Sequence, residues 1–172
     1  MAKLQVLEYP DERLRLPSVP VREFDEALVR LIDDLFETLY GAGGMALSAP
    51  QVNVRQEVLV MDLSANAGAP QTYVNPKILS SSTPGIVQES CLSVPGQTVN
   101  VIRATEVRVS ARTAAGATFE KALSGMEAVC LQHEMDHFAG KLLVDRMSLF
   151  RRLRFRRAAR GKSGRKPSAL SG

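Results

Sequence analysis

One short segment constrains this 172-residue chain more than any other. The segment His133-Glu134-Met135-Asp136-His137 is an H-E-x-x-H arrangement. Two histidines four residues apart project from one face of a helix, roughly 6 Å apart along its axis, which suits two imidazoles that bind one metal ion. Glu134 lies about 100° around the helix from His133, so it can reach a water on the ion rather than the ion itself. The segment therefore predicts a hydrolytic metal site with Glu134 as general base.

The alternative is that two ordinary histidines have this spacing by chance. The chain has only two histidines, and both lie in this segment with a glutamate at the position of the base, so we favour metal binding. Catalytic sites of this type hold three protein ligands and leave the fourth position to water. Because there is no third histidine, the third ligand is a carboxylate or one of the two cysteines, Cys91 and Cys130.

The two cysteines differ in how well they can complete the ligand set. Cys130 is seven residues before His137, an axial separation of about 10 Å that metal bonds of roughly 2 Å cannot easily span. We expect it to be a small core residue or to line a pocket. Cys91 lies between a predicted strand and a turn. Taken alone it would be read as a buried thiol, but the missing third ligand favours ligation. Two imidazoles and a thiolate still allow the ion to activate water for amide hydrolysis.

The apolar pattern predicts an α+β fold. Apolar residues at helical spacing predict an amphipathic helix over residues 24–40, and a second helix should begin near Gly125 and carry both histidines. Ser148 is a candidate cap for a last, basic helix. Runs rich in β-branched residues predict strands, mixed or antiparallel, that pack around the histidine helix. The predicted strands are 57–62, 72–74, 99–102 and 106–111.

Charge divides the chain into two parts. The net charge is +4, but nine of the 22 basic residues and no acid lie between Phe150 and Gly172, so residues 1–149 carry 13 basic against 18 acidic residues, a net charge of −5. We therefore expect one catalytic domain, 1–147, followed by a basic helix and a disordered tail, 148–172. The start has no apolar signal segment, and no stretch approaches the roughly 20 apolar residues of a membrane span, which predicts a cytoplasmic protein without membrane contact.

Three segments together resemble the peptide deformylase family. They are Gly44-Met45-Ala46-Leu47-Ser48-Ala49-Pro50-Gln51, Glu89-Ser90-Cys91-Leu92-Ser93 and Gln132-His133-Glu134-Met135-Asp136-His137, and the similarity runs from Val6 to about Met147. As a set, in this order and separation, these motifs are highly specific. A general metallopeptidase is the competing enzyme class, but such enzymes usually take a histidine or glutamate as third ligand.

The resemblance implies a function and a role for each residue. It implies hydrolysis of the N-formyl group of N-terminal formylmethionine, a step of protein biosynthesis and N-terminal methionine processing. It implies Cys91, His133 and His137 as metal ligands, Glu134 as base, and the Gln51 side chain and Leu92 N–H as oxyanion donors. The favoured ion is Fe(II), with Zn(II), Ni(II) or Co(II) as alternatives. The expected substrate-binding residues are Gly44, Met45, Ala46, Val87, Glu89, Ser90, Met126, Val129 and Cys130. Met45, Val87, Met126, Val129 and Cys130 could instead be simple core packing residues, and Glu89 could orient neighbouring groups or only form a salt bridge.

The chain departs from the family pattern at four positions. Ala46 and Ser90 replace glycines, Ser48 replaces an alanine, and Thr98 stands near the place of a usual arginine. A new Cβ can obstruct close approach of a peptide, so we expect retained chemistry with weakened or altered substrate binding. The alternative function is an impaired homologue that binds formylated chains or ribosomes without turnover.

The partners follow from the same reasoning. The expected partners are formyl-Met peptides of nascent chains. The basic tail is either a ribosome contact near the exit tunnel or simply solvated. Nothing in the sequence indicates an obligate dimer, so we expect a monomer.

Overall fold

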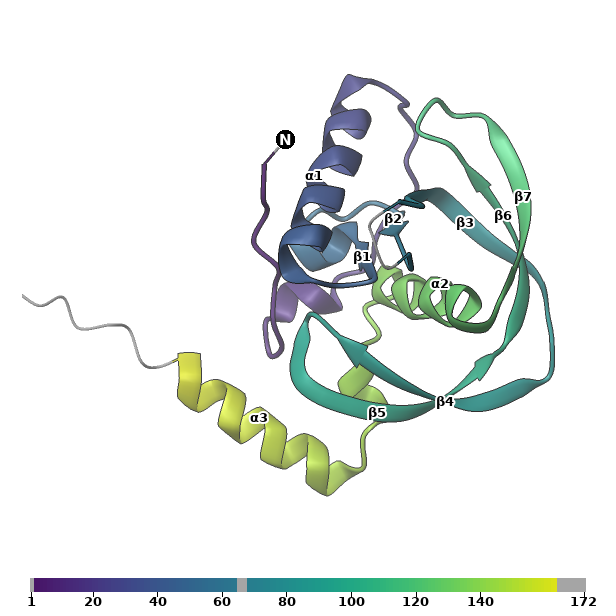
Figure 1. Ribbon diagram of the computed structural model, residues 1–172. Helices are drawn as coiled ribbons and strands as arrows, with labels where there is room; N and C mark the ends of the chain where they lie inside the picture. The colour runs from purple at the N-terminus through teal and green to yellow at the C-terminus, as the bar shows by residue number, and fades with distance from the viewer. Residues whose placement is uncertain (1, 65–67, 164–172) are drawn as a thin grey trace, which may run out of the picture.

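Two antiparallel β-sheets form the frame of the protein in a computed structural model that describes residues 2–64 and 68–163. The larger sheet has the strand order β1-β2-β3-β6-β7, and β4 and β5 form a two-stranded sheet (Figure 1). The predicted α+β class is confirmed. The strands are β1 Ala46–Ser48, β2 Val58–Met61, β3 Gln71–Ser81, β4 Pro84–Cys91, β5 Val94–Ala104, β6 Glu106–Arg112 and β7 Thr118–Ser124.

Helix α1, Glu26–Ala42, packs its apolar face on β1 and β2. The Asp25 side chain accepts a hydrogen bond from the N–H of Leu28 and so caps the first turn. The helix ends at Gly43, whose φ of 65° lies in the left-handed region that favours glycine. The prediction of a helix over 24–40 is therefore confirmed with its bounds shifted by two residues.

Helix α2, Gly125–Phe138, carries the H-E-x-x-H segment into the centre of the molecule. In Figure 1 it lies between the five-stranded sheet and the β4–β5 pair, with α1 on its other side. The helix has no distinct apolar face, because its buried positions include the polar residues His133, Glu134 and His137. After it the chain turns at Gly140, where φ is 67°. This arrangement encloses the motif on several sides.

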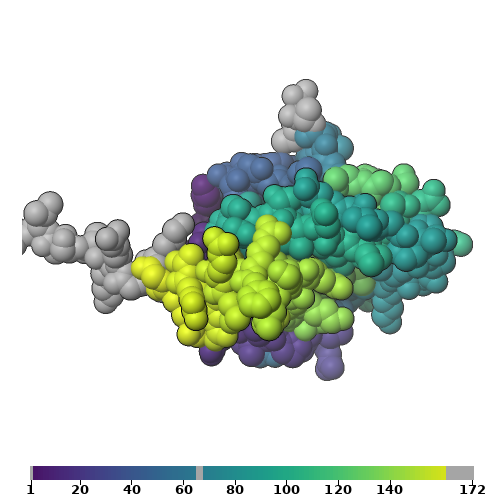
Figure 2. Space-filling model, turned by 90° about the horizontal axis from the view of Figure 1, so that it is seen from below, coloured from purple at the N-terminus to yellow at the C-terminus, as the bar shows by residue number. Residues whose placement is uncertain are grey.

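The last helix, α3, Leu149–Ser163, runs along the outside of the molecule (Figure 2). Its Phe155 ring stacks on Tyr9 with the centroids 5.8 Å apart, and Arg151 donates a hydrogen bond to the carbonyl of Thr98 at 2.7 Å. The predicted basic helix is present, and it continues through the arginine-rich sequence. The predicted disorder of the tail concerns residues 164–172, which lie outside the described residues.

Three short 3-10 helices complete the described elements: η1 Glu12–Arg15, η2 Ala49–Val52 and η3 Leu143–Arg146. The sequence predicted strands within or close to β2, β3, β5 and β6 and, without bounds, a strand before Cys91 that corresponds to β4, but β1 and β7 were not predicted. None of the helices within residues 2–64 and 68–163 combines the length and apolar character that crossing a membrane requires.

Candidate metal centre and substrate cleft

Two histidines of α2 and one cysteine of β4 come together in the core. The ligand atoms of Cys91, His133 and His137 all lie within 4.8 Å of one another, and the three residues are buried. The Sγ atom of Cys91 is 3.4 Å from Nε2 of His137, and the two imidazole centroids are 5.2 Å apart. The helix supplies the i, i+4 pair and the strand supplies the thiol from the opposite side. The sequence motif and the missing third ligand predicted this group.

A register shift presents Cys91. The pairing of β4 with β5 is regular from Pro84 to Glu89 and then shifts before the Cys91–Val94 pair. Such an irregularity re-aims a side chain relative to the regular alternation of a strand. Cys91 therefore turns toward α2 at the last residue of its strand.

The donor set fits a divalent transition metal ion. One thiolate and two imidazoles are three nitrogen and sulfur ligands, the number that catalytic sites use when they leave the fourth position to water. Burial, helped by the charges of His133 and Arg103, holds the pKa of His137 well below its ordinary value, so this imidazole is neutral, as a ligand must be. Burial alone would also lower the pKa of His133, but its hydrogen bonds to Cys91 and Glu89 raise that pKa well above the ordinary value, so His133 must release a proton when an ion binds. The chain thus supports binding of a divalent ion.

A buried charge network orients His133. Glu89 accepts from Nδ1 of His133 at 2.8 Å and from Nε of Arg103 at 2.7 Å. Arg103 also donates to Asp136 at 2.8 Å. The sequence left open whether Glu89 orients the site or only forms a salt bridge, and in the structure its carboxylate makes both contacts. It holds the ring so that Nε2 faces Cys91 and His137.

The candidate base, Glu134, is enclosed beside the metal ligands. Only 3% of its surface is exposed, and burial raises its pKa above the ordinary value. Its Oε2 atom accepts a hydrogen bond from the hydroxyl of Ser48 at 2.6 Å. A carboxylate with a raised pKa beside a metal site suits a group that takes up and returns a proton.

Gln51 lies in η2 behind the metal ligands and is almost fully buried. Its Nε2 donates to Ser93 Oγ at 3.1 Å and lies 3.7 Å from Cys91 Sγ, and its Oε1 accepts from the N–H of Ser48 at 2.9 Å. The amide is therefore held in one orientation close to the thiolate. Sequence reasoning noted Ser48 only as a replacement and missed its contacts, although Ser48 and Gln51 have the S-x-x-Q spacing of a capping box.

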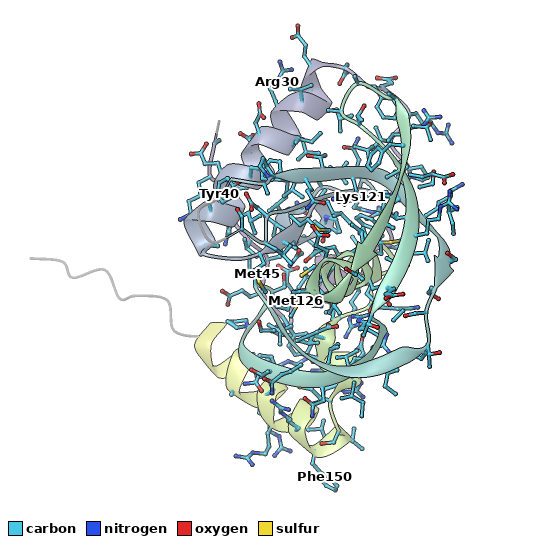
Figure 3. All side chains as sticks on the ribbon, turned by 45° about the vertical axis from the view of Figure 1, so that its right-hand side comes forward. Arg30, Tyr40, Met45, Lys121, Met126 and Phe150 are labelled. Carbon is cyan, nitrogen blue, oxygen red and sulfur yellow. The ribbon has the colours of Figure 1, made fainter. Side chains whose placement is uncertain are left out.

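A cleft of about 580 Å³ opens onto these groups. Its walls come from the segment before β1, from β4 and the turn after it, and from α2. Figure 3 labels Met45 and Met126, two partly exposed methionines that line it. The predicted residues that line the cleft are Gly44, Met45, Ala46, Glu89, Ser90, Cys91, Leu92, Met126, Val129, Cys130, His133 and Glu134.

Val87 is a predicted pocket residue that does not line the cleft. It is on the same face of β4 as Glu89 but two residues earlier, which moves it by roughly 7 Å along the strand. Cys130 does line the cleft, half-buried, and burial raises the pKa of its thiol to about 12. That thiol is protonated at neutral pH, so it serves as apolar wall rather than as a ligand.

Two substituted positions lie in opposite walls of the cleft. Ala46 belongs to β1 and Ser90 to β4, and both line it, so their side chains narrow the space between the two strands. Position 44 has less space for a side chain, because a Cβ there would lie 2.9 Å from a Leu92 methyl carbon. A side chain at position 44 would push Leu92, whose N–H is the expected oxyanion donor.

Comparisons with known proteins agree with this geometry. The model of the polypeptide deformylase family matches residues 3–152. The chain is 46% identical over 158 residues to peptide deformylases of Hahella chejuensis and Pseudomonas aeruginosa, which covers 91% of this chain and 94% of each relative. A crystal structure of a peptide deformylase from Legionella pneumophila superposes with a TM-score of 0.89 at 43% identity and covers 96% of this chain and 100% of that one. One from Ehrlichia chaffeensis in complex with actinonin has a TM-score of 0.90 at 32% identity, with the same coverage.

Proposed function

The chain belongs to the polypeptide deformylase family, and from this premise we propose that it hydrolyses the N-formyl group of N-terminal formylmethionine in nascent polypeptides and releases formate. The observation that carries the proposal is the position of Glu134 beside Cys91, His133 and His137 at a cleft of about 580 Å³. The cleft is open to a peptide chain end, and Cys91, His133 and Glu134 lie in its wall.

The roles of the side chains follow from their positions. A divalent ion held by Cys91, His133 and His137 would polarise a water molecule and lower its pKa. Glu134 takes a proton from the water as its oxygen bonds to the formyl carbon. The N–H of Leu92 and the carboxamide of Gln51 stabilise the negative charge on the formyl oxygen. Glu134 then gives the proton to the amine nitrogen as the C–N bond breaks, leaving formate and a free N-terminus.

The methionine side chain would occupy the apolar part of the cleft. Met126, Val129 and Cys130 of α2 offer a flexible apolar wall there, with Met45 across the opening. An unbranched thioether fits such a surface well. We expect Ala46 and Ser90 to narrow the groove for the following residues, which changes peptide preference rather than the chemistry.

Other features of the protein are proposed on the family resemblance and the sequence. We propose Fe(II) as the physiological ion, with Zn(II), Ni(II) or Co(II) as substitutes, because the soft thiolate and the imidazoles accept all of them. A monomer in the cytoplasm, a catalytic domain of residues 1–147, and a ribosome contact through the basic region 148–172 also stay predictions. An impaired homologue is not favoured, because the ligands and the base are all in place.

Formate release from a short formyl-Met peptide tests the proposal directly. The protein is purified without oxygen, loaded with Fe(II), and assayed beside the Glu134→Ala and Cys91→Ala variants. The expected result is turnover by the wild type and its loss in both variants, with metal retained by Glu134→Ala. A wild-type protein that binds one metal ion per chain and yet releases no formate would overturn the proposed function.

A further inference from the structure

A buried hydroxyl lies between the base and the oxyanion amide. Ser48 is the last residue of β1 and has no exposed surface. Its Oγ atom is 2.6 Å from Glu134 Oε2 and 3.0 Å from Gln51 Oε1. Ser48 therefore contacts two groups of the proposed reaction that are 83 positions apart in sequence.

We propose that Ser48 is a positioning residue, whose hydroxyl fixes the carboxylate of Glu134 and the carboxamide of Gln51 relative to each other. The proposal rests on the proposed function, because it assigns these two groups to one reaction. Ser48 does not touch the substrate in this account. It acts through the two side chains that do.

The hydrogen-bond chemistry sets the orientation of Gln51. Its Oε1 faces both the N–H and the O–H of Ser48, at 2.9 and 3.0 Å. A flipped amide would place its NH₂ group against the Ser48 N–H, two donors without an acceptor. The NH₂ end therefore points to Ser93 Oγ and Cys91 Sγ, the side on which the formyl oxygen is expected.

The hydroxyl is also important for Glu134. Among residues 2–64 and 68–163, Ser48 provides the only side-chain hydrogen bond to this carboxylate. The Ser48 hydroxyl has one proton and two acceptors, and a carboxylate attracts it more strongly than an amide oxygen does. The shorter distance to Glu134 agrees with that preference. One carboxylate oxygen is thus held, which leaves Oε1 to meet the water.

The expected size of the effect is moderate. A net hydrogen-bond contribution of this kind changes a rate by about three- to tenfold. Because the bond orients reacting groups and not the peptide, we expect the change in kcat with KM unaltered.

The kinetic test compares three metal-loaded variants with the wild type. We expect Ser48→Ala to lower kcat about three- to tenfold at constant KM, and Ser48→Thr, which keeps the hydroxyl, to restore most of it. Ser18→Ala is the matched control, because its Oγ is buried without a partner among the described residues. A Ser48→Ala enzyme with unchanged kcat, or with raised KM alone, would overturn the positioning role.

A second measurement does not depend on turnover. In ¹⁵N-labelled, Zn(II)-loaded protein, the carboxamide signals of Gln51 are identified by their loss in Gln51→Glu. Ser48→Ala should move these signals, whereas Ser18→Ala should leave them in place. Unmoved signals in Ser48→Ala would contradict the proposal even if the wild type proved inactive. If the signals move in a protein that releases no formate, the hydrogen bonds of Ser48 to Glu134 and Gln51 are supported and the proposed function is rejected.

Discussion

Nδ1 of His133 lies 2.8 Å from Oε2 of Glu89, and this contact decides which nitrogen of the ring can face a metal ion. Burial would raise the pKa of Glu89, but the hydrogen bonds from His133 and Arg103 outweigh it and lower that pKa to about 2. The carboxylate is therefore ionised at any pH at which the protein works. A fixed negative charge behind the imidazole makes it a stronger ligand.

Replacing Glu89 by glutamine should weaken metal binding while the three ligands stay in place. The neutral amide orients His133 less well and no longer balances Arg103, so we expect a loss of about 10- to 100-fold in metal affinity. Competition with a chelator measures it. Asp136→Asn is the matched control, because Asp136 pairs with Arg103 at 2.8 Å but makes no hydrogen bond to a histidine within the described chain. Equal affinities of the two variants would argue against the orienting role.

Asp145 provides a pH-dependent contribution to stability. Burial would raise its pKa, but the hydrogen bonds from Arg15 and the Leu142 N–H outweigh that effect and lower it below 3.8. A lowered folded-state pKa means that the contribution is complete above pH 3.8 and is lost as the pH falls through the folded value. We expect Asp145→Asn to reduce the free energy of unfolding by roughly 1 kcal/mol at pH 7.

Urea unfolding at several pH values checks this expectation. The difference between wild type and Asp145→Asn should shrink steadily below pH 3.8. Glu26→Gln is the control, because the Arg30–Glu26 pair has side-chain exposures of 69% and 93% and should contribute almost nothing. A difference that stayed constant down to acid pH would show that Asp145 does not act through its charge.

Gly140, just after α2, should tolerate alanine much less well than Gly43, just after α1. Both have left-handed φ values, 67° and 65°, so alanine costs about 1 kcal/mol at either from backbone strain. At Gly140 the new Cβ would also collide with the carbonyl of Arg15, whereas at Gly43 nothing lies within 4 Å. Thermal unfolding should therefore show Gly140→Ala to be destabilised by at least a further ~1 kcal/mol. Equal losses of unfolding free energy in Gly140→Ala and Gly43→Ala would mean that the backbone at Arg15 moves aside at no cost in free energy.

The sequence predicted those parts of the fold whose signals are local. The period of apolar residues located α1 and α2, and the i, i+4 histidines identified the metal helix before any contact was known. Strand β4 was predicted only as a strand without bounds before Cys91, because Gly85, Gln88 and Ser90 weaken its β-propensity. What stabilises β4 is its long pairing with β5, a partner that only the fold supplies.

The distinction between local sequence signals and contacts that only the fold supplies also applies to the site. Cys91 could be predicted because the chemistry of the motif requires a third ligand and the chain offers few candidates. The contact of Ser48 with Glu134 joins residues 86 positions apart and depends on how β1 lies against α2, so no sequence spacing indicates it. Val87 was assigned to the pocket by the family resemblance, and the length of β4 places it outside the cleft.

X-ray absorption at the metal edge tests the central claim, that Cys91, His133 and His137 hold the ion, most directly. In Zn(II)-loaded protein the account predicts one sulfur at about 2.3 Å and nitrogen or oxygen neighbours at about 2.0 Å. The sulfur should vanish in Cys91→Ala and persist in Cys130→Ala. A sulfur that survives Cys91→Ala, or a wild-type spectrum without one, would contradict the ligand set from which the whole account proceeds.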